Sequence, residues 1–195
     1  EYLDGIDLSP EEFYVKLATA NPLPTTSQPT PIEFEKVFGD AVAAGDSVIA
    51  ILLASKLSGT VQSALIAKEL CGGDIAVIDS NNVTVGLRIL VNMAVCLRDA
   101  GKTAQEIVTI LEEEKQKICL YAAVDTLEYL QKGGRLSKTA AFAGTLLNLK
   151  PLITIKDGEL QVAGKCRGMQ KAYDEIFKFV EQAGGIDFLK PIAIG

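Results

Sequence analysis

The sequence predicts an α/β protein in which short buried strands alternate with helices. Of its 195 residues, 48% are hydrophobic, and these are mostly Ala, Ile, Leu and Val rather than aromatic residues. Short apolar runs are followed repeatedly by stretches with helical spacing. This succession implies right-handed crossovers and a parallel sheet covered by helices on both faces. Ligands of such sheets bind beyond the carboxyl ends of the strands, so a site is expected at that edge.

Helix-ending and helix-capping residues indicate where the elements of the first half of the chain begin and end. Gly72-Gly73 and Gly101 each end a helical stretch. Thr103, with Glu106 three residues later, is a capping-box pattern that opens a further helix. The expected elements are a strand at residues 48–54 that is buried on both faces, a helix at 60–70, a strand at 75–78, and helices at about 83–100 and 104–115.

The second half is expected to form a lobe of its own. A polar loop at residues 131–135 interrupts two helical segments, and Asp157-Gly158 is a strong hairpin-turn signal. The expected elements are strands at 118–124, 152–155 and 159–163, a helical segment at 127–130, a helix at 169–182 and a last apolar run at 191–194. We therefore predict an N-terminal lobe with a parallel sheet at residues 1–116 and a C-terminal lobe with a mixed sheet at 117–195.

Both ends of the sequence are expected to be incomplete. Residues 1–8 are polar and turn-like with no core strand before them, and the run at 191–194 stops mid-element. We expect the N-terminal lobe to lack its first strand and the C-terminal lobe to be truncated, as in an internal piece of a longer protein.

The composition excludes several classes of function. The net charge of −6 argues against nonspecific nucleic-acid binding, which needs a surplus of Lys and Arg. The chain has no histidine, so Ser-His-Asp and Cys-His catalysis cannot be assembled from it alone. Its four cysteines include no Cys-x-x-Cys pair, and no metal site or cofactor is expected. No apolar run is long enough to span a membrane and no basic signal region opens the chain, so a cytoplasmic protein is predicted.

Two polar motifs stand just before predicted helix starts. They are Thr26-Ser27-Gln28-Pro29 and Leu57-Ser58-Gly59-Thr60. Hydroxyls and free backbone N–H groups at helix N-termini bind anions and carboxylates. Ser58 can present its hydroxyl, Gly59 allows a ligand close to the backbone, and Thr60 begins the helix. The motifs therefore predict a site for a small acidic ligand.

Each motif also has a purely structural interpretation. Pro29 restricts Gln28 to extended conformations, while Thr30 is expected as an N-cap, Pro31 as the first helical residue and Glu33 as the capping-box partner. A plain turn into a helix would have this composition, and Ser58 would serve equally as an N-cap. The two interpretations are compatible.

Three cations and one carboxylate complete the candidate residues. Arg135 follows two glycines, and Lys165 and Arg167 lie between Gly164 and Gly168, so all three are expected in or beside turns. A guanidinium on such a loop suits a phosphate or an acidic partner, although solvated charge is the usual role. Asp79 could bind a metal or cap the next helix, and capping is favoured.

Five motifs in order across nearly the whole chain resemble those of the DegV proteins. They are Thr-Ser-Gln-Pro at 26–29, Leu-Ser-Gly-Thr at 57–60, Val-Ile-Asp-Ser at 77–80, Leu-Glu-Tyr-Leu-x-Lys-Gly-Gly-Arg-Leu-Ser at 127–137, and Lys-x-Arg-Gly at 165–168. DegV proteins are bacterial fatty-acid-binding proteins that act as the lipid-carrying subunit of fatty acid kinase. The resemblance also implies an Asp-Ser strand before residue 1 and a histidine beyond residue 195.

The resemblance implies two α/β lobes with a long-chain fatty acid in a tunnel between them. Its carboxylate would contact Thr26 and Ser58, with Ser27, Gly59 and Thr60 close by. Arg135, Arg167 and Lys165 would face the acyl phosphate or the kinase catalytic subunit, which supplies ATP and the phosphoryl-transfer machinery. This chain would be a carrier in phospholipid metabolism and not an enzyme, and transient contact with a membrane surface is compatible with that role.

Two other functions remain open at this point. Ser58 could act as the nucleophile of a stand-alone hydrolase or phosphotransferase, for which a lysine such as Lys56 or Lys132 would have to be the base. Alternatively, the protein could be a lipid-responsive regulator whose ligand is only a signal. The sequence does not separate a carrier from a sensor.

Overall fold

The protein is described by a computed structural model that covers residues 2, 3, 5–136 and 149–195. Its helices are α1 (Pro10–Thr19), α2 (Pro31–Ala43), α3 (Thr60–Cys71), α4 (Thr84–Asp99), α5 (Ala104–Glu114), the short 3₁₀ helix η1 (Lys115–Lys117), α6 (Glu128–Lys132) and α7 (Met169–Gln182). Its strands are β1 (Val48–Leu52), β2 (Ile75–Asp79), β3 (Tyr121–Ala123), β4 (Leu149–Lys156) and β5 (Glu159–Arg167). Most elements lie where the sequence predicts them.

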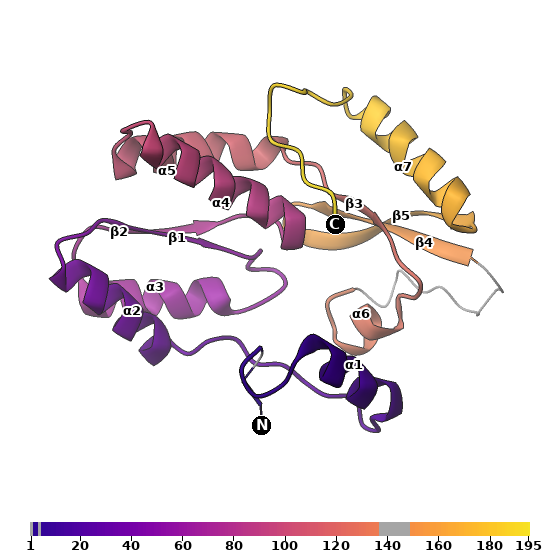
Figure 1. The fold of residues 1–195 in the computed structure, drawn as a ribbon, viewed down its shortest axis with the longest axis horizontal. Coiled ribbons are helices and arrows are strands. Elements are labelled where there is room, and N and C mark those ends of the chain that lie inside the picture. The colour runs from indigo at the N-terminus through magenta and orange to yellow at the C-terminus, as the bar shows by residue number, and fades with distance from the viewer. Residues whose placement is uncertain (1, 4, 137–148) are drawn as a thin grey trace.

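The N-terminal lobe is a three-layer arrangement around a parallel pair of strands. β1 and β2 run in register from Val48 opposite Ile75 to Leu52 opposite Asp79. Helices α2 and α3 lie on one face of this pair, and α4 and α5 lie on the other (Figure 1). Each face has its own core of buried side chains: Phe38, Ala64, Ala67 and Ile75 on the first, and Ile78, Leu90, Ile107 and Leu111 on the second. The predicted parallel α/β lobe is confirmed.

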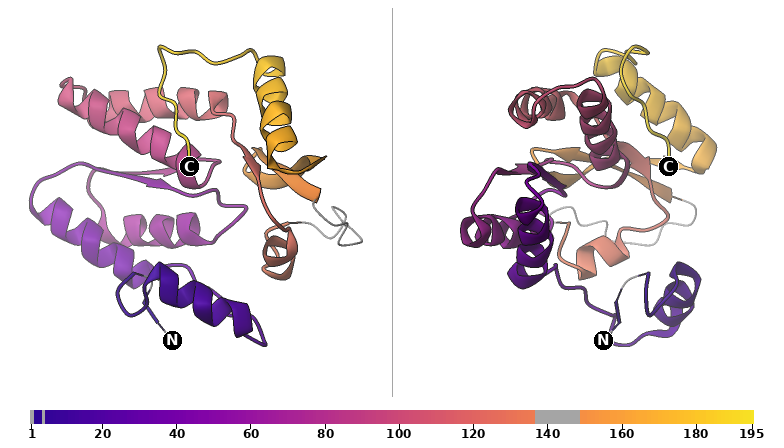
Figure 2. Two further views of the ribbon diagram at one scale, coloured as in Figure 1. Left: turned by 45° about the vertical axis from the view of Figure 1, so that its right-hand side comes forward. Right: turned by 60° about the vertical axis from the view of Figure 1, so that its left-hand side comes forward.

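The C-terminal lobe is built on a second sheet, in the order β3-β4-β5. Both pairings among these described strands are antiparallel, whereas a mixed sheet was expected for this lobe. Helix α7 packs on one face, where Phe179 stacks on Tyr121 with ring centroids 5.5 Å apart. On the other face Ile153 is buried with Leu127 and Leu136, which flank α6. Figure 2 shows the two sheets as separate layers joined by the segment between α5 and β3. The predicted boundary at residue 116 falls within η1, and we propose it as the division between lobes.

Local sequence signals fix several helix starts. Thr30 Oγ1 accepts a hydrogen bond from Glu33 N (3.3 Å), and Glu33 Oε2 accepts one from Thr30 N (2.6 Å). These contacts confirm the predicted capping box and lower the pKa of Glu33, first through the Thr30 N–H and then through its hydroxyl. The Thr103 box is confirmed in the same way, and there the Lys102 ammonium and the Thr103 N–H and hydroxyl lower the pKa of Glu106 to about 2.

Helix α1 is an element that the sequence analysis did not predict. Ser9 caps it with Glu12 as the reciprocal partner, and Pro10 occupies its first position. All of its side chains are at least partly exposed. The helix therefore depends on its local caps more than on burial, which is why an apolar pattern did not indicate it.

Three expectations about the strands need correction. β1 was expected to be buried on both faces, but all five of its residues are half-buried, because β2 is its one partner among the described strands. β4 and β5 extend well beyond the predicted 152–155 and 159–163, since the hairpin pairs as far as Leu149 opposite Arg167. Lys165, which was expected in or beside a turn, therefore lies inside a strand, and Arg167 is the last residue of that strand, directly before Gly168.

The last apolar run, at residues 191–194, forms neither a helix nor a strand. Residues 191–195 lie outside regular secondary structure. Instead, this segment runs back from α7 toward α4 (Figure 2), and the Lys190 ammonium contacts Glu114 Oε1 at 3.2 Å. A strand requires a neighbouring strand to satisfy its backbone groups, and residues 191–195 pair with none of the described strands.

Candidate functional site

The candidate site lies at the carboxyl ends of β1 and β2, where the predicted edge of the sheet meets the C-terminal lobe. Ala54 N donates to the Asn82 carbonyl (2.8 Å), which joins the two chain segments just beyond the strands. The Asp79 carboxylate accepts hydrogen bonds from Ser55 N (3.2 Å) and Asn81 N (2.9 Å). Asp79 thus fixes both loops at the edge of the sheet. The sequence had suggested that it caps α4, and it does not.

Ser58, Gly59 and Thr60 form the start of α3. Gly59 is the N-cap residue, and among the described side chains none caps the helix through a hydrogen bond at that position. Ser58 Oγ accepts from Thr60 N (3.3 Å) and lies 2.8 Å from Thr60 Oγ1. Either hydroxyl can donate in this pair, and when Thr60 donates, the Ser58 proton is free for a ligand. The first-turn amides of α3 and this hydroxyl therefore form a group of donors for an anion.

The first polar motif meets the second through Gln28. A Cβ on residue 59 would lie 2.5 Å from Gln28 Nε2 and 2.9 Å from its Cδ, so a residue larger than glycine would displace this side chain. Thr26 and Ser27, just before it, are exposed. The structure therefore brings the Thr26–Pro29 segment to the N-terminus of α3, with Gln28 in direct contact.

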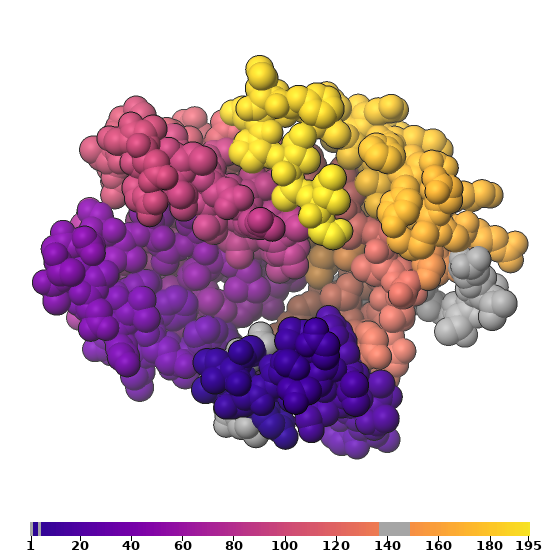
Figure 3. All heavy atoms as spheres, in the orientation of Figure 1, coloured from indigo at the N-terminus to yellow at the C-terminus, as the bar shows by residue number. Residues whose placement is uncertain are grey.

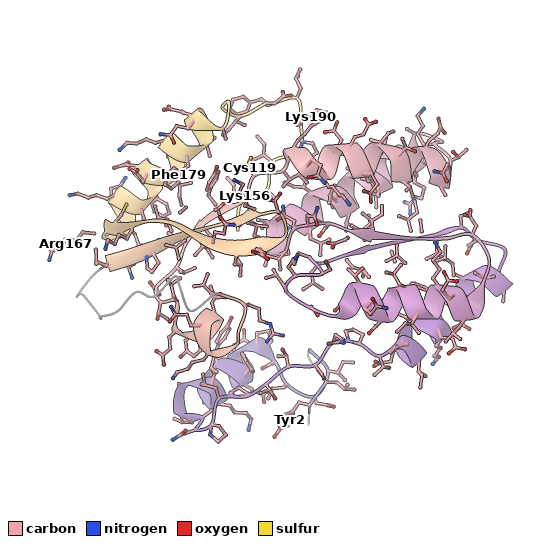
Figure 4. The ribbon with its side chains drawn as sticks, turned by 180° about the vertical axis from the view of Figure 1, so that it is seen from behind. Tyr2, Cys119, Lys156, Arg167, Phe179 and Lys190 are labelled. Atoms are coloured by element: carbon pink, nitrogen blue, oxygen red, sulfur yellow. The ribbon has the colours of Figure 1, made fainter. Side chains whose placement is uncertain are left out.

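The three predicted cations occupy different places. Arg135 reaches the second motif: its Nε donates to the Leu57 carbonyl (3.2 Å) and its Nη1 to the Gly133 carbonyl (2.6 Å). Arg167 lies at the end of the β4–β5 hairpin opposite to Lys156 (Figure 4). Eight strand residues at about 3.4 Å each separate it from the turn by roughly 27 Å. Lys165 lies two residues before Arg167 in β5. Only Arg135 is brought to Ser58.

A cavity of about 310 Å³ opens where the two lobes meet. Its lining includes Asn81, Lys115, Tyr121, Lys156 and Asp157, but neither Thr26 nor Ser58. On the face drawn in Figure 3 the surface is also hollowed between the N-terminal residues and α4, with the C-terminal lobe visible at its floor. The lobe junction therefore offers room, but the lining of the cavity includes none of the candidate donors. A tunnel that joins this room to Ser58 stays a prediction.

The chemistry of the site favours holding an acid. The polar groups that meet Ser58 Oγ are the hydroxyl and N–H of Thr60, neither of which is a base.

Within the described ranges, no group of three or more Cys, Asp or Glu side chains could hold a metal ion. In the same part of the chain, no helix is long and apolar enough to cross a membrane.

Comparison with protein families decides the family of this chain. Residues 1–190 match the family model described as "Uncharacterised protein, DegV family". The chain belongs to the DegV family. The resemblance of its five motifs is thereby confirmed.

Relatives and solved structures agree with this membership. The chain is 44% identical over 188 residues to a DegV domain-containing protein of Caldanaerobacter subterraneus subsp. tengcongensis, covering 96% of this chain and 66% of that protein. A Thermus thermophilus structure, titled as fatty acid binding of a DegV family protein, is 37% identical with a TM-score of 0.84, covering 93% of this chain and 65% of that one. A Bacillus subtilis structure, described as DegV, a fatty acid binding protein, is 31% identical with a TM-score of 0.77, covering 93% and 65%. The chain thus spans about two thirds of the length of these DegV proteins.

Several residues of this DegV site were not singled out from the sequence. Gln28 was noted only for its backbone, although the glycine at 59 that accommodates it is visible in the second motif. Asn82, only 3% exposed, joins the two strand ends through its backbone. Lys115 donates to the Asp79 carbonyl (2.9 Å), and its side chain is 10% exposed. These contacts join residues that are 28 to 36 positions apart, so no local sequence pattern indicates them.

Proposed function

We propose that this DegV chain binds a long-chain fatty acid, with the carboxylate at the start of α3 and the alkyl chain between the lobes. The observation that carries the proposal is the meeting of three motifs: Gln28 lies against Gly59, Ser58 pairs with Thr60, and Arg135 reaches Leu57. Thr26, Ser27 and Ser58 supply hydroxyls in this account. The fatty acid bound by the Thermus thermophilus and Bacillus subtilis relatives supports the choice of ligand.

The energetics of such a ligand are consistent with both ends of the site. A buried carboxylate costs several kcal/mol unless hydrogen-bond donors satisfy it. Two hydroxyls, the α3 amides and the positive end of the helix dipole are donors of the required kind. Each buried CH₂ group of the alkyl chain contributes about 0.8 kcal/mol. An acid with a long apolar chain is therefore expected to bind more tightly than a short polar acid.

The ligand can be identified without assuming it. We expect protein purified from cells to release fatty acid into an organic extract, detected by mass spectrometry at close to one molecule per chain. An unrelated protein purified in the same way is the control for adventitious lipid. Extracts that are repeatedly empty, together with no binding of added palmitate, would reject the proposal.

We further propose that the chain is a non-catalytic carrier that presents the carboxylate to a separate fatty acid kinase in the cytoplasm, at times in contact with a membrane surface. Thr26, Ser27 and Arg135 are exposed, so a second protein could reach the headgroup end. Arg167 and Lys165 would contact the kinase on a surface that extends beyond the headgroup end. A carboxylate held by neutral hydroxyls stays nucleophilic toward the phosphoryl group that the kinase supplies.

An assay of acyl phosphate formation distinguishes a carrier from a stand-alone enzyme and from a regulator. With ATP alone, palmitate-loaded protein is expected to form no acyl phosphate, and adding a fatty acid kinase catalytic subunit should start its formation, followed by trapping with hydroxylamine. Turnover of an acyl or phosphoryl substrate by the chain alone would favour a Ser58-dependent enzyme. Fatty acid binding with no use of the ligand by the kinase would favour a regulator.

A further inference from the structure

The loop that carries Ser58 joins β1 to α3 and comprises residues 53–59, called the Ser58 loop below. From the N-terminal lobe, Ala54 N bonds to the Asn82 carbonyl and Ser55 N bonds to the Asp79 carboxylate. These two contacts fix where the loop leaves the sheet. Within the loop, Leu57 N and Ser58 N both donate to the Ala54 carbonyl (2.9 and 3.3 Å), which ties the turn before Ser58 to Ala54.

The C-terminal lobe holds the middle of the Ser58 loop. Arg135 Nε donates to the Leu57 carbonyl, the peptide group directly before Ser58. The bond from Nη1 to the Gly133 carbonyl holds the guanidinium in place within its own loop. A bond between a guanidinium and a carbonyl is charge-assisted and stronger than a neutral one. Ser58 N bonds to the Ala54 carbonyl and Arg135 bonds to the Leu57 carbonyl, so Arg135 adds a constraint from the C-terminal lobe to the Leu57–Ser58 peptide.

The tip of the β4–β5 hairpin contacts the same loop. Asp157 and Gly158 both have positive φ, +51° and +78°, as two-residue hairpin turns with asparagine or aspartate before glycine adopt. A Cβ on residue 158 would lie 3.5 Å from Ala54 Cβ and from Lys56 Cγ. The Lys56–Glu159 ion pair beside it is long (3.8 Å) and exposed, so it contributes little to this contact. Lys156 in Figure 4 marks this end of the hairpin.

From these contacts we infer that the C-terminal lobe shapes the headgroup site through the Ser58 loop, with Arg135 as its positioning residue and the Gly158 tip as its support. The inference rests on the proposed function and adds to it how the acid is selected. When the lobes are docked, Ser58 and the α3 amides converge on one point. By linkage, a ligand that needs this convergence also stabilises the docking of the lobes, whereas a ligand held only by its alkyl chain does not depend on it.

A pair of ligands that differ only in the headgroup tests this inference. Palmitate and hexadecanol carry the same chain, so the ratio of their dissociation constants isolates recognition of the acid. We expect Arg135→Lys to weaken palmitate binding about tenfold and to change hexadecanol binding by less than about twofold. Lysine keeps the charge but lacks the forked guanidinium that places Nε on the Leu57 carbonyl, so the charge alone should not preserve palmitate affinity.

Further variants separate positioning from general damage. Gly158→Ala disturbs the tip while leaving Arg135 intact, and it should raise the ratio of the palmitate to the hexadecanol dissociation constant, as Arg135→Lys does. Arg98→Lys, at an exposed arginine of α4 that pairs with Asp99 (2.8 Å), is the matched control and should leave both constants unchanged. An equal loss for both ligands, or full palmitate affinity in Arg135→Lys, would overturn the inference. A wild-type protein that binds neither ligand would instead refute the proposed function.

Discussion

Replacing Thr26 and Ser58 together by alanine is expected to weaken palmitate binding about a hundredfold, because each hydroxyl removed takes a hydrogen bond from a charged carboxylate. Ser58 Oγ also accepts from Thr60 N, so the variant leaves that N–H without its present acceptor at the start of α3. Hexadecanol binding should change much less, since the chain contacts remain. Isothermal titration or displacement of a fluorescent fatty acid measures both constants.

The control for this variant removes two hydroxyls elsewhere. Thr19 Oγ1 and Thr109 Oγ1 donate to backbone carbonyls at Lys16 (3.4 Å) and Gln105 (2.9 Å), and both residues are exposed. The double change Thr19→Ala with Thr109→Ala should leave palmitate affinity as in the wild type. If the Thr26 and Ser58 variant binds palmitate with unchanged affinity while remaining folded, these residues do not hold the headgroup.

The largest expected effect on stability is that of Gly86→Ala in α4. A Cβ at this position would lie 1.9 Å from Asn82 Oδ1 and 2.4 Å from its Cγ. Asn82 is 3% exposed, and its Oδ1 accepts from Val83 N (3.1 Å), so the side chain has little freedom to move. We expect the free energy of unfolding to fall by about 2 kcal/mol, measured by urea denaturation.

A second glycine in a helix gives the matched comparison. Gly39 lies within α2, has ordinary helical φ, and a Cβ there would meet nothing within 4 Å. Gly39→Ala should therefore raise the free energy of unfolding by up to about 1 kcal/mol, through helix propensity alone. If Gly86→Ala were as harmless as Gly39→Ala, the packing at the carboxyl ends of β1 and β2 would differ from the arrangement described.

Elements with local signals were predictable from the sequence. The capping boxes of Thr30 and Thr103 involve residues three positions apart, so helix starts could be read without knowing the fold. The turn at Asp157 and Gly158 is equally local, because it needs two residues that tolerate positive φ. The alternation of apolar runs and helical spacing then gave the α/β class, because each strand of a parallel pair needs a crossover.

Features that depend on pairing partners could not be read in this way. The length of β5 follows from its register with β4, including a bulge where Leu152 pairs with Gly164 and Ile153 with Val162. No property of Lys165 or Arg167 alone places them in a strand. Cys96 and Cys119 are exposed although their type is usually buried, because exposure depends on the neighbouring elements.

The residues that supply hydroxyls to the candidate site could be predicted from the sequence. The way in which the residues of the site contact one another could not. Ser58 and Thr26 could be proposed because polar motifs before helices are visible in the sequence. The contact of Arg135 with Leu57 joins residues 78 positions apart, and Gln28 meets Gly59 across 31 positions. Such contacts are tertiary, so the sequence could name the participants but not which of them meet.

A crystal structure of the full chain with palmitate bound tests the central claim most directly. The account predicts a carboxylate oxygen within about 3.2 Å of Ser58 Oγ, at the N-terminus of α3, with the alkyl chain running between the two lobes. A carboxylate found elsewhere would contradict it, as in the cavity lined by Lys115 and Lys156 with Ser58 left without a ligand contact.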